Sequence, residues 1–225
     1  MSLTHPSPNF GERRGGQRPG LIVLHYTAME SCAAALERLC DPAAEVSAHY
    51  LIDRDGGLLH LVPEEARAWH AGEGEWAGRG DVNSRSIGIE LVNGGREPFP
   101  EPQMARLERL LPGIMARWSI SAKDVIAHAD LAPARKADPG PRFDWRRLAM
   151  QGLSVWPEDR HPAQPCDFSA NAARFGYPRA PEDAVLAAFR LRFRPWARGP
   201  LDAVDAGLAA DLAQRFPVDG TAMGA

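Results

Sequence analysis

The chain has 225 residues, of which 44% are hydrophobic and 24% are charged, and its formal net charge at pH 7 is -3. This length supports one well-buried core, or a core domain with a small appendage, and so predicts a soluble globular protein. The charges are nearly balanced and the arginines stand between acids, which excludes the basic patch of a nucleic-acid-binding protein. The three cysteines form no CxxC pair, and their odd number argues against a disulfide framework.

Residues 1–19 form an arm rich in glycine and proline, without the apolar run of a signal peptide or of a membrane span. As the sequence stands, it predicts a cytoplasmic protein with no transmembrane segment. Met1-Ser2-Leu3 is, however, a start that cloning can leave behind. If a natural export signal was removed there, the expected compartment is the periplasm or the cell envelope.

A pattern of alternating strands and helices follows this arm. Residues 21–24 are a short apolar run typical of a buried strand that ends at His25. Residues 32–40 are rich in alanine and leucine and predict a helix that stops at Asp41-Pro42. His25 is therefore expected at the end of a strand, where side chains project from the edge of a sheet.

The next segments predict a hairpin and a further strand. Residues 46–53 have strand composition, residues 54–57 form a polar turn that contains Asp-Gly, and residues 58–62 return as the partner strand. Residues 86–92 are predominantly apolar and predict another strand of the same sheet.

A long amphipathic helix is predicted after Pro102, followed by a last strand over residues 125–128. The helix rests on apolar residues at helical spacing, which are Met104, Leu107, Leu110, Leu111, Ile114, Met115 and Trp118. Residues 129–144 have no regular period and contain three prolines, so we expect a long loop, and such loops are often functional. These elements predict an α/β domain with a central mixed β-sheet flanked by helices, which ends near Pro157.

The chain changes character after this point. Residues 158–167 are rich in proline and aspartate and predict a linker. Residues 168–220 are predicted to form a small C-terminal three-helix domain, with helices over residues 169–175, 181–193 and 201–216.

Two histidines and one aspartate are candidate metal ligands. His25 and His128 stand at the ends of predicted strands, and Asp138 lies in the long loop beyond His128. A catalytic zinc ion uses three protein ligands and leaves a fourth position for water, whereas a structural zinc ion usually has four, mostly cysteine. The metal lowers the pKa of that water from ~15.7 toward roughly 7. Spacing alone leaves open that the two histidines are unrelated core or surface residues.

Four strings in a fixed order carry a more specific signal: residues 24–27 (LHYT), 68–72 (AWHAG), 86–90 (SIGIE) and 128–141 (HADLAPARKADPGP). Together they resemble the amidase type 2 family, which includes the bacterial AmpD and AmiD amidases and is related to peptidoglycan recognition proteins. The resemblance covers residues 20–157, and the EPFP stretch and the C-terminal extension make the AmiD branch the closer one. It implies a zinc-dependent N-acetylmuramoyl-L-alanine amidase, which cleaves the amide between the lactyl group of N-acetylmuramic acid and L-alanine in peptidoglycan or muropeptides.

The resemblance also implies roles for individual residues. The positions that match the family's zinc ligands are His25, His128 and Asp138. Glu90 matches the catalytic carboxylate, which takes a proton from water and passes it to the leaving nitrogen. Lys136 matches the catalytic lysine, whose ammonium group stabilises the oxyanion on the lactyl carbonyl. Some relatives use a tyrosine at the position of Ala48, so Glu90 is expected to act without it.

Three other residues are candidates for substrate binding. Trp69 and His70 are expected to form walls of the groove, because an aromatic face packs on the apolar face of a sugar, although a core role for Trp69 stays open. Arg135 is expected to bind a stem-peptide carboxylate with both arms of its guanidinium group, and the alternative is a solvated loop arginine. His49 is expected to hydrogen-bond within the domain rather than to bind metal.

The C-terminal unit, especially residues 186–195, resembles a peptidoglycan-binding domain of the three-helix type. This shorter resemblance implies a cell-wall anchor that raises the local concentration of substrate. The alternative is a helical cap that only packs on the amidase domain.

Two rival functions stay open for the whole chain. One is a peptidoglycan-binding receptor without catalysis, and the other is a zinc peptidase that cuts within the stem peptide. Because all three ligands and Glu90 are present, the enzyme is favoured over the receptor.

Overall fold

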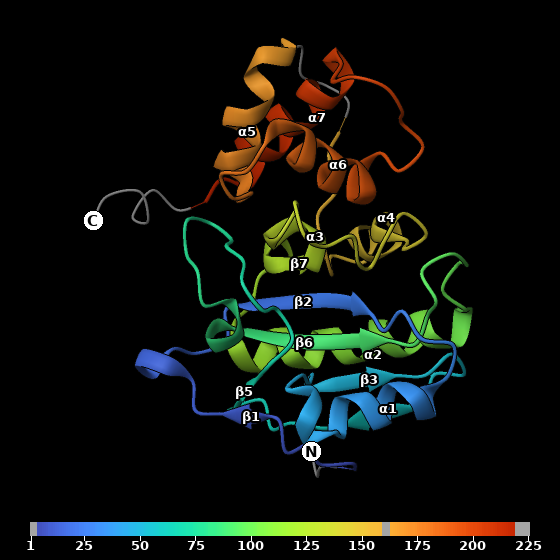
Figure 1. Cartoon of the computed structure of the whole chain (residues 1–225). Coiled ribbons are helices and arrows are strands. Elements are labelled where there is room, and N and C mark those ends of the chain that lie inside the picture. The colour runs from blue at the N-terminus through green and yellow to red at the C-terminus, as the bar shows by residue number, and fades with distance from the viewer. Residues whose placement is uncertain (1–3, 159–162, 219–225) are drawn as a thin grey trace.

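The computed structural model describes residues 4–158 and 163–218. Within these ranges the chain forms a five-stranded mixed sheet flanked by helices, with three further helices toward the C-terminus (Figure 1). In sheet order the strands are β4 (Leu58–His60), β3 (Tyr50–Ile52), β6 (Ser86–Leu91), β2 (Leu21–Tyr26) and β7 (Val125–Ala127). All neighbours pair in parallel except β3 and β4, so the predicted mixed sheet is confirmed.

The two central strands, β2 and β6, are buried along almost their whole length. Parallel strands covered on both faces have near-continuous apolar runs instead of alternating polar and apolar residues. This explains why both could be predicted from the sequence. Glu90 interrupts the apolar run of β6 and is partly exposed, which marks the end of the strand as a place where the sheet meets solvent.

The predicted hairpin joins β3 to β4, but β3 is shorter than residues 46–53. Ser47 donates its backbone N–H to the carbonyl oxygen of Trp69 (3.1 Å) and so pairs with a loop instead of with β6. The turn closes where the N–H of Asp53 donates to the carbonyl oxygen of Gly57 (2.8 Å). Gly56 has a φ of 86°, which favours glycine at this point of the turn.

Helices cover both faces of the sheet (Figure 1). The helix α1 (Cys32–Cys40) has the predicted bounds, begins at the N-cap Ser31 and buries Ala35 and Leu39 in a small cluster with Leu51 of β3. The helix α2 (Glu101–Trp118) has Pro102 in its first turn, where the missing N–H costs nothing, and it buries the predicted apolar stripe in the main core.

The expected strand over residues 125–128 and the expected loop over residues 129–144 were both wrong at the boundary between them. The strand β7 ends at Ala127, and His128 is the first residue of a short helix, α3 (His128–Leu131), instead of the last residue of the strand. A second short helix, α4 (Trp145–Met150), follows the loop and was not predicted. Both helices are too short to show a helical period in the sequence.

The predicted N-terminal arm is part of the fold from residue 4 onward. Its strand β1 (Phe10–Gly11) pairs with β5 (Arg67–Ala68) in a second, two-stranded sheet that was not predicted. Arg13 donates hydrogen bonds to the carbonyl oxygens of Ser86 and Glu64 and fastens the arm to the main domain. Residues 1–3 lie outside the described ranges.

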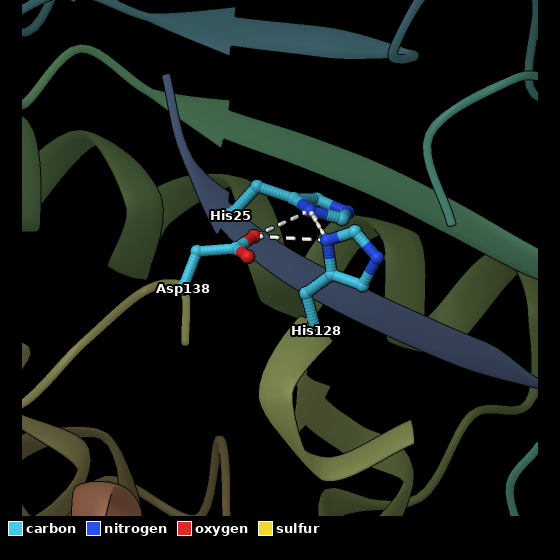
Figure 2. Close-up of side chains that lie close together, drawn as sticks. All are labelled: His25, His128 and Asp138. Carbon is cyan, nitrogen blue, oxygen red and sulfur yellow. Dashed lines mark hydrogen bonds and ion pairs between the residues drawn. The ribbon is translucent and has the colours of Figure 1, made fainter. Parts of the chain in front are cut away.

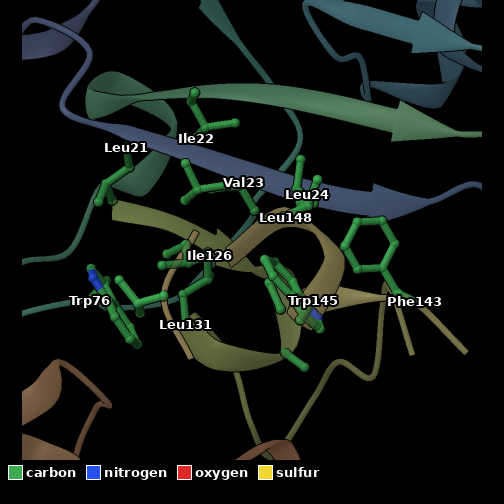
Figure 3. Close-up of a cluster of buried hydrophobic side chains, with 14 of the residues drawn as sticks. Leu21, Ile22, Val23, Leu24, Trp76, Ile126, Leu131, Phe143, Trp145 and Leu148 are labelled. Atoms are coloured by element: carbon green, nitrogen blue, oxygen red, sulfur yellow. The ribbon is translucent and has the colours of Figure 1, made fainter. Parts of the chain in front are cut away.

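One part of the main core lies between the sheet and the short helices α3 and α4. Figure 3 shows the four apolar residues of β2 above Leu131 of α3 and Trp145 and Leu148 of α4. Burial of these side chains stabilises the fold by about 1.5–3 kcal/mol for each large apolar side chain. The two short helices are therefore held by packing and not by helix propensity.

The three predicted C-terminal helices are present as α5 (Phe168–Phe175), α6 (Glu182–Phe193) and α7 (Ala203–Arg215). Their aromatic side chains belong to the same buried cluster as Leu131 and Trp145, so the helical unit and the sheet domain share a core. The predicted linker over residues 158–167 falls partly on residues 159–162, and the predicted end of the unit falls on residues 219–220, all outside the described ranges. In the described part of the chain, no helix combines the length and the apolarity that a membrane span requires.

Candidate metal centre and cleft

The sheet topology brings three of the predicted site residues to one edge. In the paired strands β2 and β6, His25 lies opposite Glu90. In β2 and β7, Leu24 lies opposite Ala127, so His128 follows at the same level as His25. The carboxyl ends of parallel strands therefore meet here, which is where open α/β sheets usually bind ligands. The loop that carries Asp138 returns to this edge, because the N–H of Ala129 donates to the Asp138 carbonyl oxygen (3.0 Å).

His25, His128 and Asp138 point toward one another (Figure 2). One carboxylate oxygen of Asp138 lies 2.9 Å from Nδ1 of His25 and 3.0 Å from Nδ1 of His128. The two Nδ1 atoms are 3.0 Å apart. Ligand atoms around a tetrahedral zinc ion, with bonds of about 2.0–2.1 Å, would stand about 3.3 Å apart. The three atoms are thus close to the spacing that a metal ion requires, and all three residues are buried.

A chain of hydrogen bonds fixes which nitrogen of His25 faces this centre. The Ser86 hydroxyl donates its only proton to the carbonyl oxygen of Val82 (2.6 Å), so it can only accept from Nε2 of His70 (3.1 Å). Burial and neighbouring histidines lower the pKa of His70 well below its usual value, so its Nδ1 carries no proton. That Nδ1 accepts from Nε2 of His25 (3.1 Å). Nδ1 of a neutral His25 is consequently left with a free lone pair.

His128 is oriented by the backbone. Its Nε2 lies 3.0 Å from the carbonyl oxygen of Ala71, which can only accept, so this nitrogen donates and Nδ1 faces Asp138. Burial, together with the nearby His128, lowers the pKa of His25 to about 4, so His25 is neutral near pH 7. A single proton can form a hydrogen bond between only two of these three atoms, the two Nδ1 atoms and the Asp138 oxygen. A metal ion would bind all three atoms at once. The donor set therefore fits a cation.

Glu90 and Lys136 lie beside the three ligands. One carboxylate oxygen of Glu90 is buried and has no hydrogen-bond partner in the described structure. Burial and the nearby charge of Asp138 together raise the pKa of Glu90 to about 8, and the charge of Lys136 offsets part of the shift. A buried carboxylate oxygen without a hydrogen-bond partner is energetically costly, and a water molecule bound to a metal ion at this centre would supply that partner. Lys136 is partly exposed, and its charge acts on both Glu90 and His25.

The centre lies at the bottom of an open cleft of about 530 Å³. The cleft is lined by residues 135–138 of the loop and by α1, whose exposed Arg38 was not among the predicted residues. Trp69 lines the cleft and is partly exposed, with its backbone N–H bonded to the Ser47 hydroxyl (2.9 Å). The structure thus brings every predicted site residue to this one cleft.

Arg135 and His70 already have protein partners. The guanidinium group of Arg135 donates to the carbonyl oxygens of Ala71 (2.9 Å) and Glu73, and so ties the loop to residues 71–73. His70 lines the cleft, but it is only 9% exposed, and both of its ring nitrogens are used by His25 and Ser86.

Two of the sequence strings that carried the resemblance touch each other at His70. A Cβ atom on Gly88 would lie 2.4 Å from Cγ of His70, so only glycine leaves room for this ring. His49 accepts a hydrogen bond from the Gly88 N–H (3.0 Å), as predicted for a histidine that bonds within the domain. Ser86 and Gly88 lie inside the SIGIE string, but nothing in the sequence indicated that they support His70 and, through it, the candidate ligand His25.

Comparison with known proteins agrees with this geometry. The sequence pattern of the Amidase_2 family, described as N-acetylmuramoyl-L-alanine amidase, matches residues 15–141. The chain is 37% identical to N-acetylmuramoyl-L-alanine amidase AmiD of Escherichia coli K12, in a match that covers 88% of this chain and 84% of that protein. It is 35% identical to 1,6-anhydro-N-acetylmuramyl-L-alanine amidase AmpD of Citrobacter freundii, over 64% of this chain and 86% of AmpD.

Solved structures likewise match either nearly the whole chain or only its sheet domain. The E. coli AmiD complex with anhydro-N-acetylmuramic acid-L-Ala-D-gamma-Glu-L-Lys superposes with a TM-score of 0.82 at 32% identity, covering 94% of this chain and 99% of AmiD. AmpDh3 of Pseudomonas aeruginosa in complex with anhydromuramic pentapeptide gives a TM-score of 0.81 at 32% identity, covering 91% and 94%. A selenomethionine AmpD derivative gives 0.61 at 32% identity and covers 68% of this chain but 99% of itself. The likeness to AmiD therefore includes the C-terminal helices.

Proposed function

This chain belongs to the N-acetylmuramoyl-L-alanine amidase family, and we propose that it hydrolyses the amide between the lactyl group of N-acetylmuramic acid and L-alanine in peptidoglycan or its fragments. The observation that carries the proposal is the cluster of His25, His128 and Asp138 beside Glu90 at the bottom of the cleft. The solved complexes of AmiD and AmpDh3 hold anhydromuramyl peptides, so the same chemical class of substrate is the one to test first.

The ion that we propose for this centre is zinc. Two imidazole nitrogens and one carboxylate oxygen suit a tetrahedral zinc ion that keeps one position open for catalysis. When bound there, zinc would act as a Lewis acid on the lactyl carbonyl and lower the pKa of water. The protein's own contribution is to hold the two Nδ1 atoms and one carboxylate oxygen 2.9–3.0 Å from one another in a buried position, with each imidazole oriented by a hydrogen bond at its Nε2.

Glu90 is proposed as the proton carrier. Among the described residues none donates a hydrogen bond to its buried oxygen, which leaves that oxygen available to accept a proton from the attacking water. A carboxyl group whose pKa is raised to about 8 can hold that proton and pass it to the leaving L-alanine nitrogen. Lys136 is proposed to donate a hydrogen bond to the oxyanion that forms on the lactyl carbonyl, since an ammonium group stabilises developing negative charge.

Substrate contacts are proposed for the walls of the cleft. The partly exposed ring of Trp69 offers an apolar face to a sugar. Arg135 and Arg38 both line the cleft, where their guanidinium groups would bind carboxylates of the stem peptide. His70 contributes to the wall only with its small exposed fraction, and its larger proposed role is to hold His25.

For the C-terminal unit we keep the proposal of peptidoglycan binding. Its resemblance to three-helix peptidoglycan-binding domains supports an anchor that increases the local substrate concentration. The shared core with the sheet domain supports the alternative of a helical cap. Binding of purified peptidoglycan to a catalytically inactive full-length variant, compared with the same variant carrying substitutions on α5, would separate the two.

The first experiment is mass spectrometry of muropeptides, with and without the 1,6-anhydro ring, after incubation with the protein in the presence or absence of a zinc chelator. Release of intact stem peptide that stops with the chelator is the expected result. Cleavage of the anhydro form alone would place the substrate among recycled wall fragments. Muropeptide binding without cleavage would replace the enzyme by a receptor, and cuts within the stem peptide would make it a peptidase.

The role of Glu90 is tested in the same assay. Glu90→Gln keeps the shape of the side chain, so the zinc content should stay at one equivalent while turnover falls by about a hundredfold or more. Glu97→Gln, at an exposed carboxylate that pairs with Arg54, is the matched control and should behave as the wild type. Wild-type turnover in Glu90→Gln would remove Glu90 from the mechanism.

A further inference from the structure

The short helix α3 carries a metal ligand at its first position and is held by a carboxylate at its third. Asp130 lies two residues after His128 and accepts a hydrogen bond from the backbone N–H of Ala127 (2.9 Å). This hydrogen bond closes the first turn of α3, because it joins the residue before His128 to the residue two positions after it. The backbone position of this ligand depends on where the carboxylate of Asp130 is held.

The other partners of Asp130 come from the C-terminal helical unit. Arg192 of α6 donates from Nη1 to the carboxylate oxygen Oδ2 of Asp130 (2.5 Å), and the hydroxyl of Tyr177 donates to Oδ1 (2.6 Å). The second arm of Arg192 donates to the carbonyl oxygen of Val125 (3.0 Å) and to the Ser154 hydroxyl (3.2 Å). One arginine thus holds both the strand before His128 and the helix that starts with it.

This ion pair is completely enclosed. The side chains of Arg192 and Asp130 have an exposed fraction of 0%. The guanidinium carbon of Arg192 lies 4.4 Å from the ring centre of Trp145 and 4.8 Å from that of Phe193. A buried ion pair of this kind adds little net stability, because the cost of removing both charges from water nearly cancels their attraction. Its geometric effect is larger, since two charges fixed in an apolar surrounding allow few other arrangements.

The helical unit also contains a buried ion pair whose partners all belong to the helical unit. Arg190 of α6 binds Asp205 of α7 and the carbonyl oxygens of Gly199 and Pro200. Asp205 has an exposed fraction of 0% and Arg190 one of 10% at the side chain. None of these partners belongs to α3 or to β7. The two arginines are therefore similar in chemistry and burial, and they differ in whether they reach the metal ligand.

From this arrangement we infer that Arg192 and Asp130 are positioning residues for the metal site, through which the C-terminal unit holds His128 in its ligand position. A metal site tolerates displacements of only about 0.5 Å in its ligands. Loss of Arg192 would leave a buried carboxylate without its counter-charge, and Asp130 would move α3 as it seeks another partner. The inference rests on the proposed metal site but not on the reaction.

The test uses the full chain and measures metal binding directly. Arg192→Met and Arg190→Met each remove one buried guanidinium from α6, and both are titrated with zinc against a chromophoric chelator, at a temperature where each is folded. Arg192→Met should bind zinc at least about tenfold more weakly, whereas Arg190→Met should keep the wild-type affinity. Substitution with cobalt provides a second reading, because the visible spectrum changes with ligand geometry and not with overall stability.

Wild-type zinc affinity and an unchanged cobalt spectrum in Arg192→Met would overturn the inference, as would equal losses in both variants. If Arg192→Met does not fold, Tyr177→Phe decides, because it keeps the ion pair and removes one hydrogen bond to Asp130. We expect it to weaken zinc binding about threefold, and unchanged binding would count against a positioning role. A protein that binds zinc normally but cleaves no muropeptide would refute the proposed function and leave this inference standing.

Discussion

Replacement of Gly88 by alanine should damage the proposed metal site indirectly, through the ring of His70. An added Cβ would lie 2.4 Å from Cγ, 2.5 Å from Cδ2 and 2.7 Å from Nδ1 of the buried His70 ring. Ordinary contact begins at 3.4 Å, so the ring must retreat by about 1 Å. Such a movement breaks the 3.1 Å hydrogen bond between His70 and His25. We expect a loss of about 1–3 kcal/mol in stability from overpacking.

The metal should respond as well, because His25 loses the partner that fixes its orientation. Loss of such a supporting hydrogen bond typically weakens metal binding by about tenfold to a hundredfold. Zinc affinity is measured by chelator competition and stability by chemical denaturation of the metal-free protein. Gly20→Ala is the matched control, because no atom lies within 4 Å of its added Cβ.

A double variant identifies the cause of the damage. In His70→Ala/Gly88→Ala the ring that clashes is absent, so the second substitution should cost little stability beyond the first. Strict additivity of the two losses would refute the reasoning. Wild-type zinc affinity in Gly88→Ala would do the same.

Three further changes follow from the structure. Ser86→Ala removes the acceptor of His70 Nε2, so zinc should bind about tenfold more weakly while turnover at saturating zinc stays near the wild-type value, as zinc titration and kinetics would measure. Lys136→Met should lower turnover by about a hundredfold at saturating zinc without weakening zinc binding, and a turnover within a few-fold of wild type would remove Lys136 from the mechanism. Burial would raise the pKa of Glu64, but hydrogen bonds from Arg117 and two other side chains hold it at about 2, against 4.5 for a free glutamate. This stabilisation, at most about 3 kcal/mol, is present above pH 4.5 and is lost as the pH falls toward 2. In denaturation experiments at a series of pH values, Glu64→Gln should therefore lose less stability on acidification than the wild type. An unchanged loss of stability at acid pH would contradict the assignment.

Much of the site could be predicted because its ligands follow regular elements. The apolar run of β2 ends at His25, and the run of β7 ends just before His128, so a pattern of buried strands already places both at one edge of a sheet. Tertiary packing decided the remainder. α3 has four residues, and its first turn is closed by Asp130 together with a partner from 62 positions along the chain. No local pattern contains that information.

The supporting residues were hidden for a related reason. Ser86 and Gly88 look like ordinary members of a buried strand, and their contacts with His70 exist only after β6 and the loop at residues 68–72 have come together. Arg192 appears in the sequence as one of two arginines on the helix α6, where basic residues would be expected in solvent. Arg192 can be completely buried because it pairs with Asp130, a residue far away in the sequence.

The proposed metal site joins parts of the chain that are far apart in sequence, and this predicts how the protein unfolds. His25 is oriented through His70 and Ser86, and His128 through Asp130 and the helical unit. Binding of an ion therefore depends on the folding of both the sheet and the helical unit. Zinc at a hundred times its dissociation constant should stabilise the folded chain by about 2.7 kcal/mol. Because the two parts share one core, calorimetry with and without chelator should show a single transition that shifts as a whole. A chelator that splits the transition, and moves only the part containing the sheet, would show that the helical unit does not support the metal site.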